Sequence, residues 1–289
     1  MKNIYITKLF RKRLSKKIRF MIISVCICLV LVASSSIYRQ VATNAQPINQ
    51  CLLAKASGCN TNVQESVLST SGSSQPLTQQ ERFVSTITQK LKVIPQLGTY
   101  EYTLLRSYGA AFVNPSNDVK LPDKVLLTTE EETQEFQTQL TLEKVVGTND
   151  CYLQKAAADA LNKAKIQQHI PLKSGYGKSD CTRNFATNLR FWQKYANNTT
   201  LEKVKEGKET AILGVVAPPG ASQHLWGLAI DLGVNNQKQR QVLNQNGWFQ
   251  TVVKDVPHWT YLGIPAEDLP KFGFKNQVVQ GITYWLTPL

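Results

Sequence analysis

Two histidines and one aspartate in the last third of the chain restrict its possible folds more than any other feature. His224 and Asp231 lie in the segment 217–233, which contains a Pro-Pro-Gly turn and continues into a short apolar run. His258 follows in the sequence Asp-Val-Pro-His-Trp-Thr-Tyr. A catalytic zinc site takes three protein ligands and leaves a fourth position for water. We therefore expect the fold to bring His224, Asp231 and His258 together around one Zn2+.

The residues next to the expected ligands indicate how each side chain is presented. The Pro-Pro-Gly turn places His224 in a loop or at a strand edge, and Asp231 ends an apolar stretch that predicts a strand. Asp255 lies three residues before His258, on the opposite parity of a strand, so a bend is needed for both side chains to face one metal. Pro257 is the expected source of that bend. Asp255 is then placed to accept a proton from water and return it to a leaving amine.

The first 39 residues form a segment of a different kind. Residues 1–40 contain nine Lys and Arg but neither Asp nor Glu, and residues 20–38 carry no charge. A membrane-spanning helix needs about 20 apolar residues, and a basic flank keeps the N-terminus in the cytoplasm. We expect residues 1–39 to be a transmembrane anchor, with a cleaved signal peptide as the alternative. Either one would place the following domain in the cell envelope, on the extracytoplasmic (periplasmic) side.

Net charge does not indicate a nucleic-acid-binding protein. The formal charge is +13 at pH 7, but outside residues 1–40 the chain has 24 basic and 20 acidic residues. No basic stripe with interleaved aromatic residues follows the N-terminal segment. We expect no nucleic-acid partner, membrane contact only through the N-terminal segment, and a monomer.

Cysteine usage agrees with export. Two of the six cysteines lie in the apolar segment, which leaves four for an oxidising compartment. Four cysteines allow three pairings, and the spacing favours Cys51–Cys59 and Cys151–Cys181. Residues 40–79 are rich in Gln, Ser, Thr and Asn, a composition that predicts a polar linker.

Residues 80–289 mix helical and strand patterns without a regular βαβ order, which predicts a single α+β domain. Helices are expected over 81–91, from 128, over 152–164, from a cap at 179 or 180 through 192, and over 237–246. Strands or extended segments are expected over 100–105, 109–113, 211–216, 228–231, 259–262 and 278–286, and a surface loop over 197–208.

Three segments carry a resemblance to a known family. The segment 217–233 resembles the Ser-x-His-x-x-Gly-x-Ala-x-Asp motif of D-alanyl-D-alanine carboxypeptidases of the vancomycin-resistance type. These enzymes belong to the zinc peptidase group that includes lysostaphin and the murein endopeptidases. The segment 255–263 is similar to their second motif, Glu-x-x-His followed by an aromatic residue and Val/Leu-Gly, and 174–176 resembles their Ser-Gly-Tyr-Arg segment. The similarity covers residues 151–262.

The resemblance implies an α+β fold in which helices flank a small antiparallel sheet. It implies zinc held by His224, Asp231 and His258, and hydrolysis of the terminal D-Ala-D-Ala bond of peptidoglycan stem peptides. The residues it assigns to catalysis or to contacts with these peptides are Asp255, Ser174, Tyr176 and Ser222.

Two positions depart from the family's pattern. Asp255 stands where the family has Glu, and a base misplaced by about 1 Å can cost on the order of 10²-fold in rate. Gly177 stands where the family has an Arg that would bind the substrate carboxylate, and Lys178 and Arg183 are the candidates to replace it. These departures leave two alternatives open. One is a peptidoglycan endopeptidase of the same group, and the other is a non-catalytic descendant that binds zinc and wall peptide.

Overall fold

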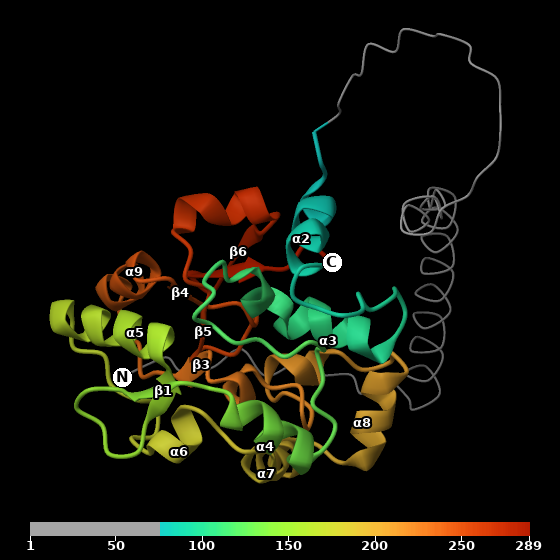
Figure 1. The fold of residues 1–289 in the computed structure, drawn as a ribbon, viewed down its shortest axis with the longest axis horizontal. Helices are drawn as coiled ribbons and strands as arrows, with labels where there is room; N and C mark the ends of the chain where they lie inside the picture. The colour runs from blue at the N-terminus through green and yellow to red at the C-terminus, as the bar shows by residue number, and fades with distance from the viewer. Residues whose placement is uncertain (1–75) are drawn as a thin grey trace, which may run out of the picture. The chain divides into compact units, whose positions relative to one another are not determined.

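The computed structural model describes residues 76–289, which form an α+β domain of helices and small antiparallel sheets (Figure 1). The predicted fold class is thereby confirmed for this part of the chain. The predicted anchor or signal peptide, nearly all of the predicted linker and the Cys51–Cys59 pair lie outside the described residues. Within residues 76–289, no helix has the length and apolar character needed to cross a membrane.

Most of the α-helices begin at a Thr or Asn whose side chain accepts a backbone N–H of the first turn, the usual role of an N-cap. The α-helices are α2 (Gln79–Ile87), α3 (Tyr100–Tyr108), α4 (Glu130–Thr138), α5 (Lys155–Gln167), α6 (Gly177–Asp180), α7 (Phe185–Tyr195), α8 (Asn198–Lys205) and α9 (Gln237–Gln245). Short 3-10 helices are η3 (Gly109–Val113), η4 (Ala211–Gly214), η5 (Gln223–Trp226) and η6 (Ala266–Phe272).

The central sheet brings two of the expected ligands side by side. It contains β3 (Ala229–Asp231), β5 (His258–Tyr261) and β4 (Trp248–Phe249), in the antiparallel order β3–β5–β4. Its register pairs Asp231 directly with His258. Cross-strand partners in an antiparallel sheet have Cβ atoms about 4.5–5.5 Å apart, so the pairing itself places the two side chains together.

Two further sheets are antiparallel pairs. They are β1 (Leu142–Lys144) with β2 (Tyr152–Gln154), and β6 (Lys275–Val279) with β7 (Ile282–Leu286). Residues 278–286 were expected to form one strand, but Gln280 and Gly281 adopt φ values of 51° and 77° and turn the chain into a hairpin. Two successive residues with positive φ match the type I′ hairpin turn.

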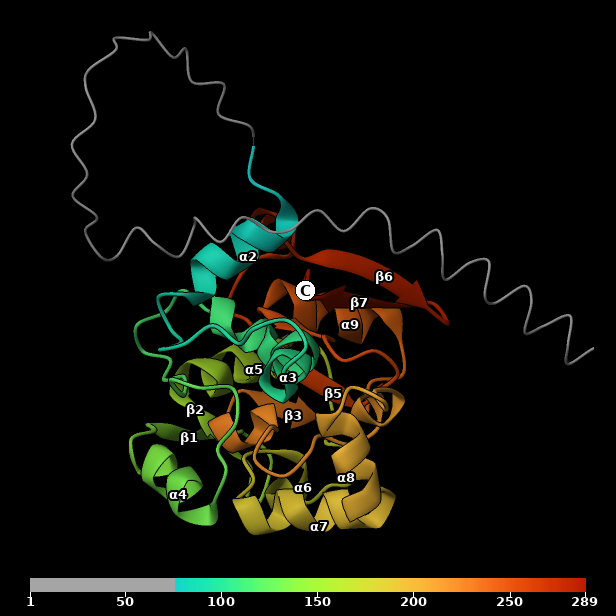
Figure 2. The ribbon, with the colours of Figure 1, turned by 90° about the vertical axis from the view of Figure 1, so that its right-hand side faces the viewer.

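Helices enclose the central sheet (Figures 1 and 2). α5 packs against α9 beside the sheet, and α4 contacts both α7 and η5 near the other side of β3. At the end that carries the β6–β7 hairpin, α2 packs on η6, with the Phe83 and Phe274 rings edge to face. Trp248 and Trp259 of the sheet are fully buried. Large aromatic side chains dominate the energetics of such a core.

The predicted disulfide between Cys151 and Cys181 is present and buried. It joins the residue before β2 to the residue after α6, across a sequence separation of 30. A cross-link of this span stabilises a fold by about 2–4 kcal/mol.

Side-chain caps explain why segments that were expected to be extended are helical. Residues 100–105 and 109–113 were expected to be extended, but Thr99 accepts the N–H of Tyr102 and starts α3, which continues into η3. The expected strand over 211–216 is instead η4, because the Glu209 carboxylate accepts the N–H groups of residues 211 and 212. A local acceptor for the first N–H groups of a turn offsets the strand preference of β-branched and aromatic residues.

Caps and strand pairing change three further segments. Most of the expected surface loop 197–208 is instead α8, which is capped by Asn197 and buries Val204. The cap of α7 is Asn184, not Ser179 or Asp180. The helix predicted over 152–164 begins only at Lys155, because the three residues before it pair with β1. The helix expected over 237–246 is confirmed as α9.

Gly220 and Gly98 make a matched pair for testing the fold around the Pro-Pro-Gly turn. Both have positive φ, 84° and 88°, but a Cβ on Gly220 would lie 1.9 Å from the Leu127 carbonyl oxygen, whereas one on Gly98 meets nothing within 4 Å. We expect Gly98→Ala to lower the free energy of unfolding by about 1–2 kcal/mol. Gly220→Ala should cost a further ~1–3 kcal/mol from overpacking. Denaturant unfolding measures both, and equal losses would contradict the close packing of residues 127 and 220.

Candidate metal centre

Three side chains converge at the edge of the central sheet. His224 is presented by η5, Asp231 by the end of β3 and His258 by the start of β5. The distance from Nε2 of His224 to Nδ1 of His258 is 3.2 Å. Oδ1 of Asp231 lies 3.3 Å from the former nitrogen and 3.6 Å from the latter. The structure thus brings together the three residues that the sequence predicted as ligands, in a group that could hold a metal ion.

Hydrogen bonds on the far side of each imidazole decide which nitrogen carries the proton. Nδ1 of His224 lies 2.9 Å from the Cys181 carbonyl oxygen, which can only accept, so this nitrogen is the donor. Nε2 of His258 likewise faces Oε1 of Gln223 at 2.8 Å. In the neutral form of each imidazole, the nitrogen that faces Asp231 is therefore the unprotonated one. Two lone pairs and a carboxylate oxygen, with no proton between them, fit a cation.

Burial keeps the centre in the form that binds metal. His224 is 1% exposed, and its burial, together with the nearby Arg183 charge, lowers its pKa to about 4. Burial alone would raise the pKa of Asp231, yet the charge of His224 in its protonated form and the Arg183 guanidinium hold it well below its usual value. At neutral pH the site thus offers a neutral imidazole and a carboxylate, as metal binding requires.

Arg183 fixes the orientation of the Asp231 carboxylate. Its guanidinium forms an ion pair with Oδ2 of Asp231, donates to the Ser179 carbonyl oxygen at 2.5 Å and lies 4.6 Å from the centroid of the Phe191 ring. The Arg183 side chain is only 11% exposed. Because Oδ2 is engaged by Arg183, Oδ1 remains directed toward the two imidazoles.

The turn that presents His224 is held by a buried amide. Asn188 of α7 accepts the Gly220 N–H at 2.7 Å and donates to the Ala217 carbonyl oxygen at 3.1 Å. Ser222 then caps η5, because its hydroxyl oxygen accepts the backbone N–H of His224 at 3.4 Å. In the sequence, Asn188 is a polar residue on the apolar face of a helix, a pattern that does not predict its contact with the turn.

A cavity of about 460 Å³ opens over the metal-ligand group, and Asp255 lines it. The bend expected near Pro257 is a turn in which the His258 N–H donates to the Asp255 carbonyl oxygen at 3.2 Å. Lys254, just before it, has a φ of 74°. Within residues 76–289 the Asp255 carboxylate makes no hydrogen bond or ion pair, and burial raises its pKa to about 6, with a smaller contribution from the Asp231 charge.

The structure separates the residues that the sequence predicted as substrate contacts. Ser174, Tyr176, Arg183 and Ser222 line the cavity, but Lys178 is exposed and does not. Ser174 is also bound within its own loop, because its hydroxyl and its N–H both donate to the buried carboxylate of Asp180. Tyr176 is 74% exposed, which leaves its ring at the mouth of the cavity.

Steric exclusion explains why no arginine follows Ser174-Gly175-Tyr176. A Cβ on Gly177 would lie 2.2 Å from the backbone of Asp150, so only glycine fits here. Two cations that the sequence did not single out, Lys173 and Lys194, line the cavity instead. Nothing in their sequence context distinguishes them from other surface lysines.

Together, these features define a class of protein, an α+β domain with a candidate metal centre beneath an open cavity. Comparison with known families identifies the segment more closely. Residues 151–274 match the family model described as VanY, D-alanyl-D-alanine carboxypeptidase. The family recognised in the sequence is thereby confirmed for the part of the chain that carries the centre.

Among solved structures, the vancomycin-resistance D,D-dipeptidase VanXYg, in complex with a D-Ala-D-Ala phosphinate analogue, is similar at 18% sequence identity and a TM-score of 0.33. The match covers 47% of this chain and 62% of that one. No curated protein matches the chain.

Two arginines beside Phe191 allow a controlled test of the carboxylate's orientation. Both guanidinium groups lie over its ring, but only Arg183 contacts Asp231. We expect Arg183→Leu to weaken Zn2+ binding by about 10–100-fold, the usual effect of losing a group that orients a ligand. Competition with a chromophoric chelator measures it, with Arg190→Leu as the control. An equal affinity in the two variants would contradict this role.

Proposed function

We propose that the protein is a zinc-dependent D,D-carboxypeptidase that hydrolyses the terminal D-Ala-D-Ala bond of peptidoglycan stem peptides. One observation carries the proposal. His224, Asp231 and His258 converge beneath a cavity lined by Asp255, inside the segment that matches the VanY family. The buried disulfide supports an extracytoplasmic location, because such bonds persist in oxidising compartments.

Zinc suits the donor set of this centre. Two imidazoles and one carboxylate, without a thiolate, form a three-ligand set of the kind that catalytic zinc sites use. When bound, zinc would supply Lewis acidity toward the scissile carbonyl and make a water molecule more acidic.

Asp255 is the proposed proton carrier. A general base works best when its pKa lies near the operating pH, and burial places the pKa of Asp255 at about 6. Its carboxylate accepts the proton of the attacking water and returns it to the leaving amine. Lys254, in the left-handed conformation, precedes Asp255, and a turn at Pro257 follows it. We propose that this local backbone compensates for the shorter side chain.

Substrate contacts are proposed for Ser174, Tyr176, Ser222 and Arg183, in the same cavity. Since Arg183 is engaged by Asp231 and Lys178 lies outside the cavity, Lys173 and Lys194 replace the family's arginine in binding the terminal carboxylate. A lysine binds as a point charge and lacks the two-pronged geometry of arginine.

A second function is favoured by Gly177. Because no arginine fits there, the requirement for a free terminal carboxylate is weaker, as it would be in an endopeptidase that cuts cross-links. Purified protein given a pentapeptide precursor and a cross-linked peptide dimer distinguishes the two activities. Release of D-Ala from the pentapeptide alone supports the carboxypeptidase, and cleavage of the dimer alone supports the endopeptidase.

Replacing the proposed base tests catalysis separately from metal binding. We expect Asp255→Asn to reduce D-Ala release by about 10²–10⁴-fold, the usual share of a general base, while bound zinc per chain stays unchanged. Asp118→Asn, at an exposed aspartate outside the cavity, serves as the control. Full activity in Asp255→Asn would contradict the assigned role. If folded, zinc-loaded wild-type protein cleaves neither peptide, only the non-catalytic wall-peptide-binding alternative remains.

The pH dependence follows from the same carboxylate. A base acts when deprotonated, so kcat/KM should rise with pH through the pKa of Asp255 and level off above it. That pKa is about 6 without metal, and the charge of bound zinc will lower it, so the apparent value should be 6 or less. Profiles from pH 4.5 to 8 at saturating zinc measure it. A rate that increases from pH 7 to pH 5 would contradict the assignment.

A further inference from the structure

We infer that Gln223 is a positioning residue that fixes His258 as a ligand through its Nδ1 atom. The inference rests on the proposed metal centre, but not on the proposed peptidase activity. Gln223 lies next to His224 in the chain, yet its side chain serves the other histidine. Gln223 is 1% exposed, and its amide hydrogen-bonds to Tyr108, His258 and Thr260.

The orientation of the Gln223 amide follows from its partners. Its Nε2 donates to the Tyr108 carbonyl oxygen at 2.6 Å. A backbone carbonyl can only accept, so the amide nitrogen must face Tyr108 and Oε1 must face the sheet. There Oε1 accepts from Nε2 of His258 at 2.8 Å and from the Thr260 hydroxyl at 2.8 Å.

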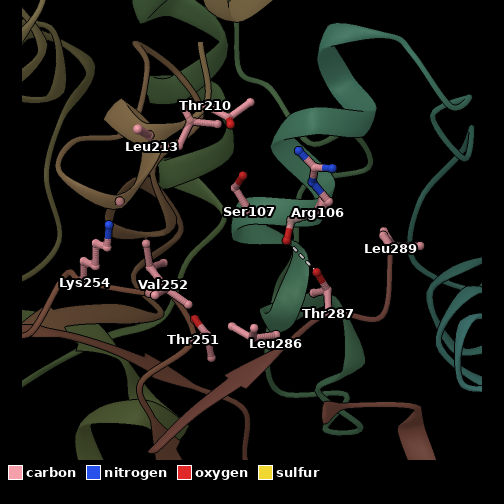
Figure 3. A pocket seen from close by; sticks show the side chains of 13 residues that line it. Arg106, Ser107, Thr210, Leu213, Thr251, Val252, Lys254, Leu286, Thr287 and Leu289 are labelled. Carbon is pink, nitrogen blue, oxygen red and sulfur yellow. Dashed lines mark hydrogen bonds between the residues drawn. The ribbon is translucent and has the colours of Figure 1, made fainter. Parts of the chain in front are cut away.

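The threonines behind this amide complete the network. His258 and Thr260 are two residues apart on β5, so both side chains lie on one face of the strand. The Thr260 hydroxyl donates its single proton to Gln223, so the Thr251 hydroxyl must be the donor in their contact at 2.8 Å. Thr251 also lines a second cavity, of about 370 Å³ (Figure 3).

Each link in this network has only one possible direction. The Tyr108 carbonyl fixes the orientation of the Gln223 amide, and the amide oxygen fixes the proton on Nε2 of His258. Nδ1 of His258 is left with its lone pair toward Asp231. Metal-binding histidines commonly donate to a carboxylate, a carbonyl or water, and a carboxylate makes the ligand more basic. Here both imidazoles donate to neutral oxygens. Asp231 thus remains the anionic member of the ligand set.

The experiment measures Zn2+ affinity of the full chain by chelator competition, together with the Nε2–H proton signal of His258 in the metal-free protein. Gln223→Met keeps the size of the side chain but removes its hydrogen bonds. We expect a 10–100-fold loss of zinc affinity and loss of the exchange-protected, downfield Nε2–H signal. Gln239→Met is the control, because Gln239 is also a buried glutamine that donates to a backbone carbonyl, that of His169.

Gln223→Glu separates positioning from a general loss of structure. It retains the acceptor that faces His258 and, in its protonated form, also the donor that faces the Tyr108 carbonyl oxygen. The Nε2–H signal should therefore persist, and zinc affinity should stay within tenfold of that of the wild type. A tenfold loss in Gln223→Glu, or equal affinities in Gln223→Met and Gln239→Met, would overturn the inference. None of these readouts uses a peptide, so absence of D,D-peptidase activity would count against the proposed function alone.

Discussion

Three hydrogen-bond acceptors that face one another without a proton between them are the constraint on which the rest of the site depends. They are Nε2 of His224, Oδ1 of Asp231 and Nδ1 of His258. In a buried site, acceptors that face one another repel unless a cation binds between them. Each is held in place by a separate contact: the first by the Cys181 carbonyl, the second by Arg183 and the third by Gln223. The disulfide, the sheet register and the buried amide network therefore serve one centre.

Much of this centre could be predicted from the sequence because its chemistry depends on rare residue types. Histidines are few in this chain, and two of them lie near turns and carboxylates. Gln223 and Asn188 could not be predicted, since an amide reveals its role only through its partners. The main-chain partner of Gln223, Tyr108, lies 115 residues away in sequence. Several of the wrong secondary-structure predictions share a cause, because caps such as Glu209 direct the backbone into helical turns that hydrophobic patterns do not reveal.

The absence of the family's arginine also has a structural cause. The backbone of Asp150, next to the disulfide-bonded Cys151, occupies the space that a side chain at Gly177 would need. The cation nearest the centre, Arg183, comes instead from the loop after α6 and contacts a proposed metal ligand. Charge compensation at the ligand and binding of the substrate carboxylate are thus separate tasks here, the first performed by Arg183 and the second proposed for two lysines.

The central claim is that His224, Asp231 and His258 hold a metal ion. Equilibrium dialysis of the full chain against Zn2+, followed by elemental analysis, tests it most directly when His258→Ala is measured beside the wild type. The account predicts one zinc ion per wild-type chain and none retained by the folded variant. Equal zinc contents in the two proteins, or no zinc in either, would contradict it.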